Sequence, residues 1–301
     1  MVELFSCGDN FSALLKGQLN NMSKFIISTL FLLTLLALTS NSQPKTGILK
    51  STTYRTEKYE FSMGGTIVLT GAPDGSISIE GWQKNEVLIE AEIELNAPTE
   101  ADLAKLSALT GFVVDKDYNS MRIISVGTHD KDYLKRVAKK LPKNLIGLPF
   151  KINYKVKLPI YSDVEVNGGR GDFNFSGIDG NVSIQFLEAN KAKLNVSGGT
   201  INASFGSGDI EVNLLASSWR GRFLNVGLGK GTMQVNLPAN TNAELDISIL
   251  QEGKIENGLI IKPRDREEVN DKRISARIGN GGATLSFKVI NGILKISEQS
   301  Q

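Results

Sequence analysis

Gly208-Asp209-Ile210-Glu211-Val212-Asn213-Leu214 is one copy of a phrase that this chain repeats: a glycine, a small polar residue, and then apolar and polar residues in strict alternation. The other copies lie between residues 168 and 237 and begin at Gly171, Gly180, Gly199 and Gly231. Alternation with a period of two is typical of a half-buried strand, and glycine beside Asp, Asn or Thr is typical of a turn. This stretch therefore predicts a series of short strands joined by tight turns.

The spacing of these glycines leaves room for one strand and one turn in each unit. Gly171 to Gly180 is a step of nine residues, as is Gly199 to Gly208, and a strand at 192–196 fills the longer interval between them. A unit that contained a helix would need about 20 to 45 residues. Strand-turn units bury their apolar faces only by stacking, so the sequence predicts an all-β fold, a β-solenoid or β-helix-like stack of short strand-turn repeats. A β-sandwich is the alternative, although sandwich strands differ more in length and turn type.

Further strands and two small helical insertions are predicted outside the repeats. In the predicted strand at 87–95 the outward side chains are acidic, and in the predicted strand at 151–158 they are lysines. We therefore expect these two strands to lie side by side with their charges paired. The first insertion starts at 98–102 and carries a narrow apolar stripe, and the second spans 130–141 with Leu134, Val137, Ala138 and Leu141 on one face. After a strand at 283–289, Asn291-Gly292 predicts a hairpin turn.

The order of these features divides the chain into six predicted segments. They are residues 1–21, a start assigned too early or an extended n-region; 22–42, a signal peptide; 43–59, a polar lead-in; 60–160, an N-terminal β region with helical insertions; 161–296, the glycine-punctuated β-strand repeats; and 297–301, a frayed tail.

The signal peptide is predicted from three neighbouring features. Lys24 is followed by the short apolar run Phe25 to Leu38 and then by the small polar residues Ser40 to Ser42. We expect cleavage near Ser42 and an extracytoplasmic location, in the periplasm, on the cell surface or secreted. The apolar run is short for a bilayer span, so no transmembrane anchor is expected in the mature chain.

Composition excludes several classes of function. The chain has 301 residues and a formal net charge of +2, which argues against a surface dedicated to nucleic acid. Its single cysteine, Cys7, precedes the signal peptide, so a disulfide framework or a thiolate metal site is not expected. His129 is the single histidine, which leaves too few ligands for a metal cluster and no partner set for a catalytic triad. We expect no catalytic residue, no metal and no cofactor.

The motifs of this chain resemble those of the bacterial putative-adhesin family of exported β-strand repeat domains of unknown function. The resemblance covers about Gly64 to Ile296 and is carried by the exported start, Gly-Ser-Ile-Ser-Ile-Glu-Gly-Trp at 75–82, Lys-Val-Lys-Leu-Pro at 155–159, and the strands that open on Gly-X-Gly-Asp. It implies a β-solenoid-like extracytoplasmic domain without catalytic residues. Relative to the simplest members, the helix at 130–141 looks like an insertion.

Two hypotheses of function follow. The first is a non-enzymatic cell-envelope or secreted domain with a structural or weak multivalent binding role, whose candidate partners are envelope glycan, an anionic surface polymer or another protein. The alternative is a β-helical enzyme that binds or processes surface polysaccharide. Such an enzyme needs paired carboxylates, and Asp209 with Glu211 is the one close pair in the repeats.

Two sets of residues are candidates for binding. Outward polar residues of successive strands would form one broad face: Asn174, Ser183, Gln185, Asn202, Ser204, Asn213, Gln234 and Asn236, with Glu211 among them. The rival site is the basic side of the second helix, formed by Lys135, Arg136, Lys139 and Lys140. Contacts through that helix would be electrostatic and would weaken with salt.

Overall fold

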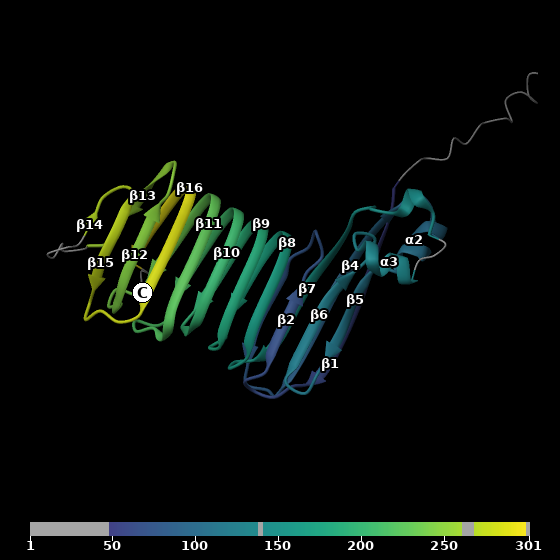
Figure 1. Cartoon of the computed structure of the whole chain (residues 1–301), viewed down its shortest axis with the longest axis horizontal. Coiled ribbons are helices and arrows are strands. Elements are labelled where there is room, and N and C mark those ends of the chain that lie inside the picture. Colours follow the sequence, from purple (N-terminus) through teal and green to yellow (C-terminus); the bar gives the residue numbers. More distant parts are fainter. Residues whose placement is uncertain (1–47, 138–140, 261–267, 299–301) are drawn as a thin grey trace, which may run out of the picture. The chain divides into compact units, whose positions relative to one another are not determined.

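The computed structural model describes residues 48–137, 141–260 and 268–298. The predicted segments 1–21 and 22–42 lie outside the described residues, as do Lys139 and Lys140. From Ile48 onward the chain forms one compact unit. Its strands join in a single sheet of sixteen strands (Figure 1). The prediction of an all-β fold with small helical insertions is therefore confirmed.

Five long strands form the centre of the sheet and run parallel to one another. Ile201 of β10 lies level with Val182 of β9, and Ile210 of β10 lies level with Met233 of β11, so equivalent residues of the repeated phrase are neighbours across the sheet. Figure 1 shows the five strands side by side in the order β8 (Asp163–Ser176), β9 (Asn181–Val196), β10 (Gly198–Leu214), β11 (Arg220–Leu237) and β16 (Thr284–Glu298).

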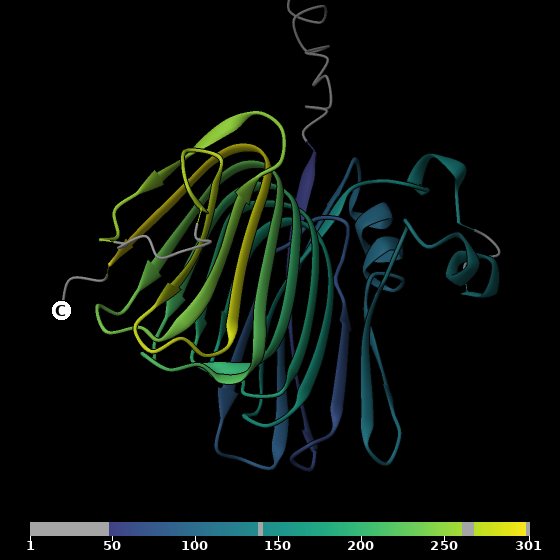
Figure 2. The ribbon, with the colours of Figure 1, turned by 60° about the vertical axis from the view of Figure 1, so that its left-hand side comes forward.

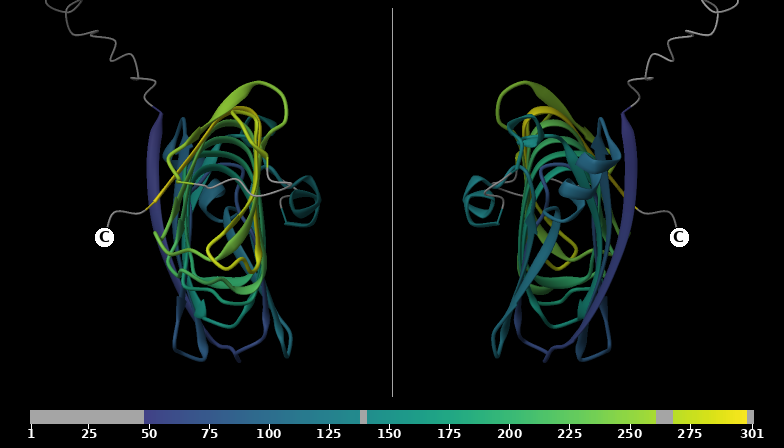
Figure 3. Two further views of the ribbon diagram at one scale, coloured as in Figure 1. Left: turned by 90° about the vertical axis from the view of Figure 1, so that its left-hand side faces the viewer. Right: turned by 90° about the vertical axis from the view of Figure 1, so that its right-hand side faces the viewer.

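Each long strand bends near its middle and wraps around a common core (Figures 2 and 3). In β10, Phe205 before the bend and Ile210 after it are both buried. Phe173, after the bend of β8, packs on Phe186, before the bend of β9, with ring centroids 5.5 Å apart. The first and second halves of the long strands therefore lie on opposite sides of one apolar layer.

The bend occurs at glycines that stack from strand to strand. Gly208 has φ +133°, and a Cβ there would lie 1.7 Å from the carbonyl oxygen of Ala189. Gly231 on the next strand has φ +137°, and its Cβ would lie 2.0 Å from the carbonyl oxygen of Gly208. Both the positive φ and the close approach of the backbones require glycine. We call the set at this level the corner glycines: Gly75, Gly171, Gly208, Gly231, Gly253 and Gly292.

The remaining strands extend the sheet on each side of the bend. Alongside the second half of β8 lie, in order, β3 (Ile77–Trp82), β7 (Phe150–Pro159), β4 (Glu86–Ala97) and β1 (Leu49–Glu60). Alongside its first half lie β2 (Thr66–Thr70), β6 (Ser120–Val126) and β5 (Gly111–Lys116). Beyond β16 lie β12 (Ala243–Ile249), β15 (Arg273–Ile278) and β14 (Glu268–Val269) on the first half and β13 (Gly253–Asn257) on the second.

The acidic and basic strands are neighbours, as predicted. β4 and β7 are antiparallel, with Glu90 level with Lys155 and Glu94 level with Lys151. Glu94 makes its ion pair with Lys50 of β1, at 2.5 Å. This edge strand comes from the polar lead-in, where no strand was predicted, and none of its side chains is buried.

The predicted hairpin at Asn291-Gly292 is wrong. β16 continues through both residues, and Gly292 lies level with Gly231 of β11. Its φ of +150° bends the strand at a corner glycine without reversing the chain. A pair of residues that permits a turn in isolation serves as a bend here, because β11 pairs with β16 on both sides of it.

The first helix follows the prediction and the second follows it in part. Helix α2 (Glu100–Ser107) is capped by Thr99, whose hydroxyl accepts from the Asp102 amide at 3.1 Å. Helix α3 (Lys131–Val137) lies within the predicted span 130–141, of which residues 138–140 are outside the described residues, and Val137 of its apolar side is 49% exposed. Leu134 is buried as expected. A short 3-10 helix, η1 (Lys143–Leu145), precedes β7.

Two glycines of β11 provide a matched test of the corner. Gly231→Ala should lower the free energy of unfolding by more than about 2 kcal/mol, because it adds backbone strain and a clash with the carbonyl of Gly208. Gly227→Ala should have little effect, since a Cβ there would have no neighbour closer than the Ala203 oxygen at 3.9 Å. Denaturant unfolding of both variants measures the difference, and equal stabilities would contradict the role of the corner.

The alternation is tested by adjacent residues of the same strand. Val235→Asp should destabilise the fold by at least about 3 kcal/mol, since Val235 is fully buried and the carboxylate would have no partner. Gln234→Thr, on the exposed side, should change the midpoint of thermal unfolding by no more than a few degrees. Similar midpoints for both variants would show that the assignment of the two sides is wrong.

Candidate functional site

The predicted neutral binding residues do not form one broad face. Ser183, Gln185, Asn202 and Ser204 lie before the bend, and Asn174, Asn213, Gln234 and Asn236 lie after it. Since the buried side chains of both halves point into the same core, the outward side chains of the two halves point away from each other. We call the outer surface of the first halves the first face and that of the second halves the second face.

A continuous row of polar side chains crosses the second face. Pairing register places one outward residue of each of ten adjacent strands at the same level, from β1 to β13, over about 43 Å at the usual strand spacing. All ten are exposed or half-buried. We call this the polar row: Thr56, Glu90, Lys155, Ser78, Asn174, Lys193, Glu211, Gln234, Lys295 and Glu256.

Charged residues of the polar row occur as adjacent residues of opposite sign, separated by neutral groups, and two of these couples form ion pairs. Lys193 lies 3.2 Å from Glu211, and Lys295 lies 3.5 Å from Glu256. A hydrogen bond from the Asn213 amide, with a smaller contribution from Lys193, lowers the pKa of Glu211. The carboxylate of Glu211 is therefore held in its ionised form.

Asn213 and Asn236 belong to a ladder of amides beside the polar row. The Asn236 amide donates to the Asn213 side-chain oxygen at 2.8 Å, and the Asn213 amide donates to Asn195 at 2.9 Å. Ser297 extends the ladder by donating to Asn236 at 3.0 Å. Asn213 is only 7% exposed. These amides satisfy one another, so they fix the register of the strands more than they offer groups to a ligand.

An open hollow of about 550 Å³, which we call the main hollow, lies on the polar row. Two of the candidate binding residues, Asn174 and Gln234, line it together with charged residues outside the candidate binding set: Asp172, Lys191, Lys193 and Asp209. The alternation Lys191-Ala192-Lys193 already marked two of these as outward residues of a strand. A smaller hollow of about 210 Å³ lies farther along the same row, between Thr56, Glu90 and Lys155.

The basic helix is separate from both faces. Lys135 and Arg136 are exposed on α3, which lies in the connection between β6 and β7 (Figure 1). Lys135 pairs with Asp132 at 2.7 Å, which offsets part of the positive charge. His129, just before the helix, is exposed but has one side of its ring packed near Phe150, and this partial desolvation lowers its pKa. Within residues 48–137, 141–260 and 268–298, no cluster of three or more His, Cys, Asp or Glu could hold a metal ion.

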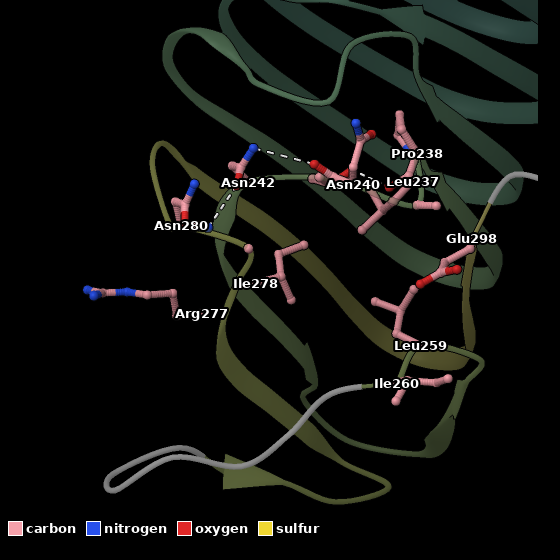
Figure 4. A pocket seen from close by; sticks show the side chains of 13 residues that line it. Leu237, Pro238, Asn240, Asn242, Leu259, Ile260, Arg277, Ile278, Asn280 and Glu298 are labelled. Carbon is pink, nitrogen blue, oxygen red and sulfur yellow. Dashed lines mark hydrogen bonds between the residues drawn. The ribbon is translucent and has the colours of Figure 1, made fainter.

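A third hollow, of about 610 Å³, was not predicted from the sequence (Figure 4). Leu237, Leu259 and Ile278 give it apolar walls, and asparagines line its other side. The backbone amide of Asn280 donates to Asn242 at 2.7 Å, so part of this polar lining is already hydrogen-bonded. Two of the lining residues, Ile260 and Glu298, are followed in sequence by residues 261–267 and 299–301, which lie outside the described residues.

Comparison with known proteins gives a limited likeness. No protein-family model and no curated protein matches the chain. A putative cell adhesion protein from Clostridium sporogenes matches at 11% identity and a TM-score of 0.43, over 83% of this chain and 100% of its own. A putative adhesin from Bacteroides fragilis matches at 13% identity and a TM-score of 0.26, over 82% of this chain and 97% of its own.

A putative adhesin from Parabacteroides merdae matches at 12% identity and a TM-score of 0.21, over 82% and 96% of the two chains. The descriptions of these neighbours name the kind of protein that the sequence resembles. Among the described residues, no helix is long and apolar enough to cross a bilayer.

The amide ladder generates a test with a matched control. Asn213→Leu should cost about 1–3 kcal/mol, because Asn195 and Asn236 each lose a partner in a half-buried position. Asn202→Leu removes one amide contact, with Asn225 at 3.0 Å, from an exposed position and should cost less than about 0.5 kcal/mol. Chemical denaturation compares them, and a silent Asn213→Leu would show that the ladder does not stabilise the fold.

Proposed function

We propose that this chain is an exported, non-enzymatic β-solenoid that binds an extended polymer of the cell envelope through the polar row of its second face. The solenoid interpretation is supported by the parallel register of the long strands and by the corner glycines. Export rests on the sequence features of residues 22–42, with cleavage near Ser42.

The observation that carries the proposal is the continuity of the polar row. A small-molecule site is concave and mostly apolar, whereas this row is long, polar and open, and two hollows lie on it. Each exposed contact would contribute little, but a partner that follows the row engages many at once. An envelope glycan suits the mixture of hydroxyl, amide and paired charges; an anionic polymer or another protein are the other candidate partners.

The polysaccharide-processing alternative has weaker support. A glycoside hydrolase needs a carboxylic acid whose pKa is raised so that it can donate a proton. The carboxylates of the main hollow include Glu211, whose pKa is lowered by Asn213 and Lys193. Glu211 is therefore suited to hydrogen bonding and ion pairing, not to acid catalysis.

The test compares the two faces. Asn174→Arg/Thr232→Arg/Gln234→Arg should weaken binding of the exported chain to isolated envelope polysaccharide at least about tenfold, by filling the main hollow with bulky charge. The matched control is Ser183→Arg/Asn202→Arg/Ser204→Arg on the first face, which adds the same charge. Sedimentation with the insoluble polysaccharide measures binding.

Two other outcomes would overturn the proposal. Equal losses in both triple variants would show that charge, not the second face, governs binding. Loss on Lys135→Gln/Arg136→Gln/Lys139→Gln/Lys140→Gln together with strong salt dependence would assign the contact to the basic helix instead.

A further inference from the structure

One rim of the coil brings together three loop tips that belong to neighbouring strands. Thr66, the first residue of β2, lies level with Ser120 of β6 and Asp163 of β8, the first residues of those strands. Backbone hydrogen bonds tie the loops together: Thr66 donates to the Asn119 carbonyl at 3.0 Å, and Asp163 donates to the Gly65 carbonyl at 3.0 Å. The tips are therefore held side by side along the rim seen at the bottom of Figure 3.

Each of these tips exposes one large apolar or aromatic side chain. Tyr118 is fully exposed, Tyr161 is 56% exposed and Met63 is 50% exposed. The series stops at β9, where the preceding loop buries Ile178. Exposed apolar residues are usually scattered singly over a surface, whereas these three lie on adjacent tips. We call Met63, Tyr118 and Tyr161 the apolar rim.

The tips are formed by turns whose backbone groups are partly satisfied internally. The Gly65 amide donates to Ser62 at 3.4 Å, the Asp117 amide to Ser120 at 2.8 Å, and the Ser162 amide to Pro159 at 3.1 Å. Internal hydrogen bonding lowers the cost of moving a turn into an apolar medium. The three hollows described above are lined by residues other than these three. These features favour insertion of the tips into a partner over binding of a ligand in a pocket between them.

The chemistry of the rim fits the boundary between lipid headgroups and acyl chains. Tyrosine combines an apolar ring with a polar hydroxyl and is enriched at that boundary, and methionine adapts its shape to irregular surroundings. Lys84, on the turn between β3 and β4, lies beside the rim, because the backbone of its turn bonds to Ile160 and Phe61. Its ammonium lies 3.5 Å from a Glu86 carboxylate oxygen and 4.6 Å from the centre of the Trp82 ring, and its side chain is 63% exposed, so a phosphate can still reach it. Asp117 and Asp163 are acidic residues of these tips, and the Asp163 carboxylate accepts from the backbone and side-chain amides of Asn181.

From these observations we propose that the apolar rim inserts shallowly into a lipid bilayer surface and holds the coil beside the membrane. This contact is distinct from the polar row, which lies on the second face and not at the strand ends. Insertion of three side chains without a spanning segment gives weak, reversible attachment. The second face would then stay free for the polymer proposed above.

The experiment measures binding of the exported chain to vesicles of phosphatidylcholine and phosphatidylglycerol by flotation. Tyr118→Ser/Tyr161→Ser should reduce the bound fraction at least about tenfold, since it removes both rings from the rim. The matched control is Leu187→Ser/Leu250→Ser, which removes two side chains of similar exposure, 61% and 59%, near the corner glycines. This control should bind vesicles as the unchanged chain does.

A second measurement reports insertion directly and does not depend on stability. Tyr118→Trp should give a blue shift of tryptophan emission when vesicles are added, whereas Tyr54→Trp, at an exposed position on β1, should give none. Failure of the unchanged chain to float with vesicles, or equal floating of both serine variants, would overturn the proposal. The proposal would also be overturned if the Tyr118→Ser/Tyr161→Ser variant lost its binding to polysaccharide and bound no vesicles. The arginine variant of the second face should keep its vesicle binding, so failure of either proposal can be recognised separately.

Discussion

The close approach of backbones at the corner glycines is the constraint on which the rest of this structure depends. The carbonyl oxygen of one corner occupies the space that a side chain on the next would need, as between Gly208 and Gly231 and again between Gly231 and Gly292. Each strand must therefore bend at the same level as its neighbour. Because the bend is shared, the two halves of every long strand can enclose a single core, and the apolar members of the repeated phrase point inward on both sides.

A shared bend also fixes the register, and the register determines the outer surface. Side chains at equivalent positions become neighbours across the sheet, so that Asn195, Asn213 and Asn236 form a hydrogen-bonded ladder and Lys193 meets Glu211. Individually such exposed contacts are worth little. Their value here is positional, since they align polar groups over many strands into the polar row. The strand ends are aligned by the same register, which places the tips of the apolar rim together.

Much of this architecture could be predicted from local pattern, and the failures have physical causes. Alternation identifies buried and exposed positions, as at Ile210 and Gln234, because each depends only on the side of the strand. The bends could not be predicted, because Asn291-Gly292 is a turn or a corner according to which strand lies beside it. For the same reason the candidate binding residues were assigned to one face. Alternation shows whether a side chain points into the core or out of it, but outward side chains before and after a bend point in two different directions. β1 was missed because an edge strand with polar sides lacks a burial pattern.

The separation of the two faces is the central claim, and disulfide trapping tests it most directly. The chain has one cysteine, Cys7, before the predicted cleavage site, so introduced cysteines can be paired without competition in the exported chain. Asn174→Cys/Lys193→Cys places thiols on register partners of the second face, within disulfide reach. Gln185→Cys/Lys193→Cys places them on one strand, on either side of the bend. The account predicts rapid oxidation of the first pair and none of the second within the folded monomer; rapid closure of the second pair, with the first remaining reduced, would contradict it.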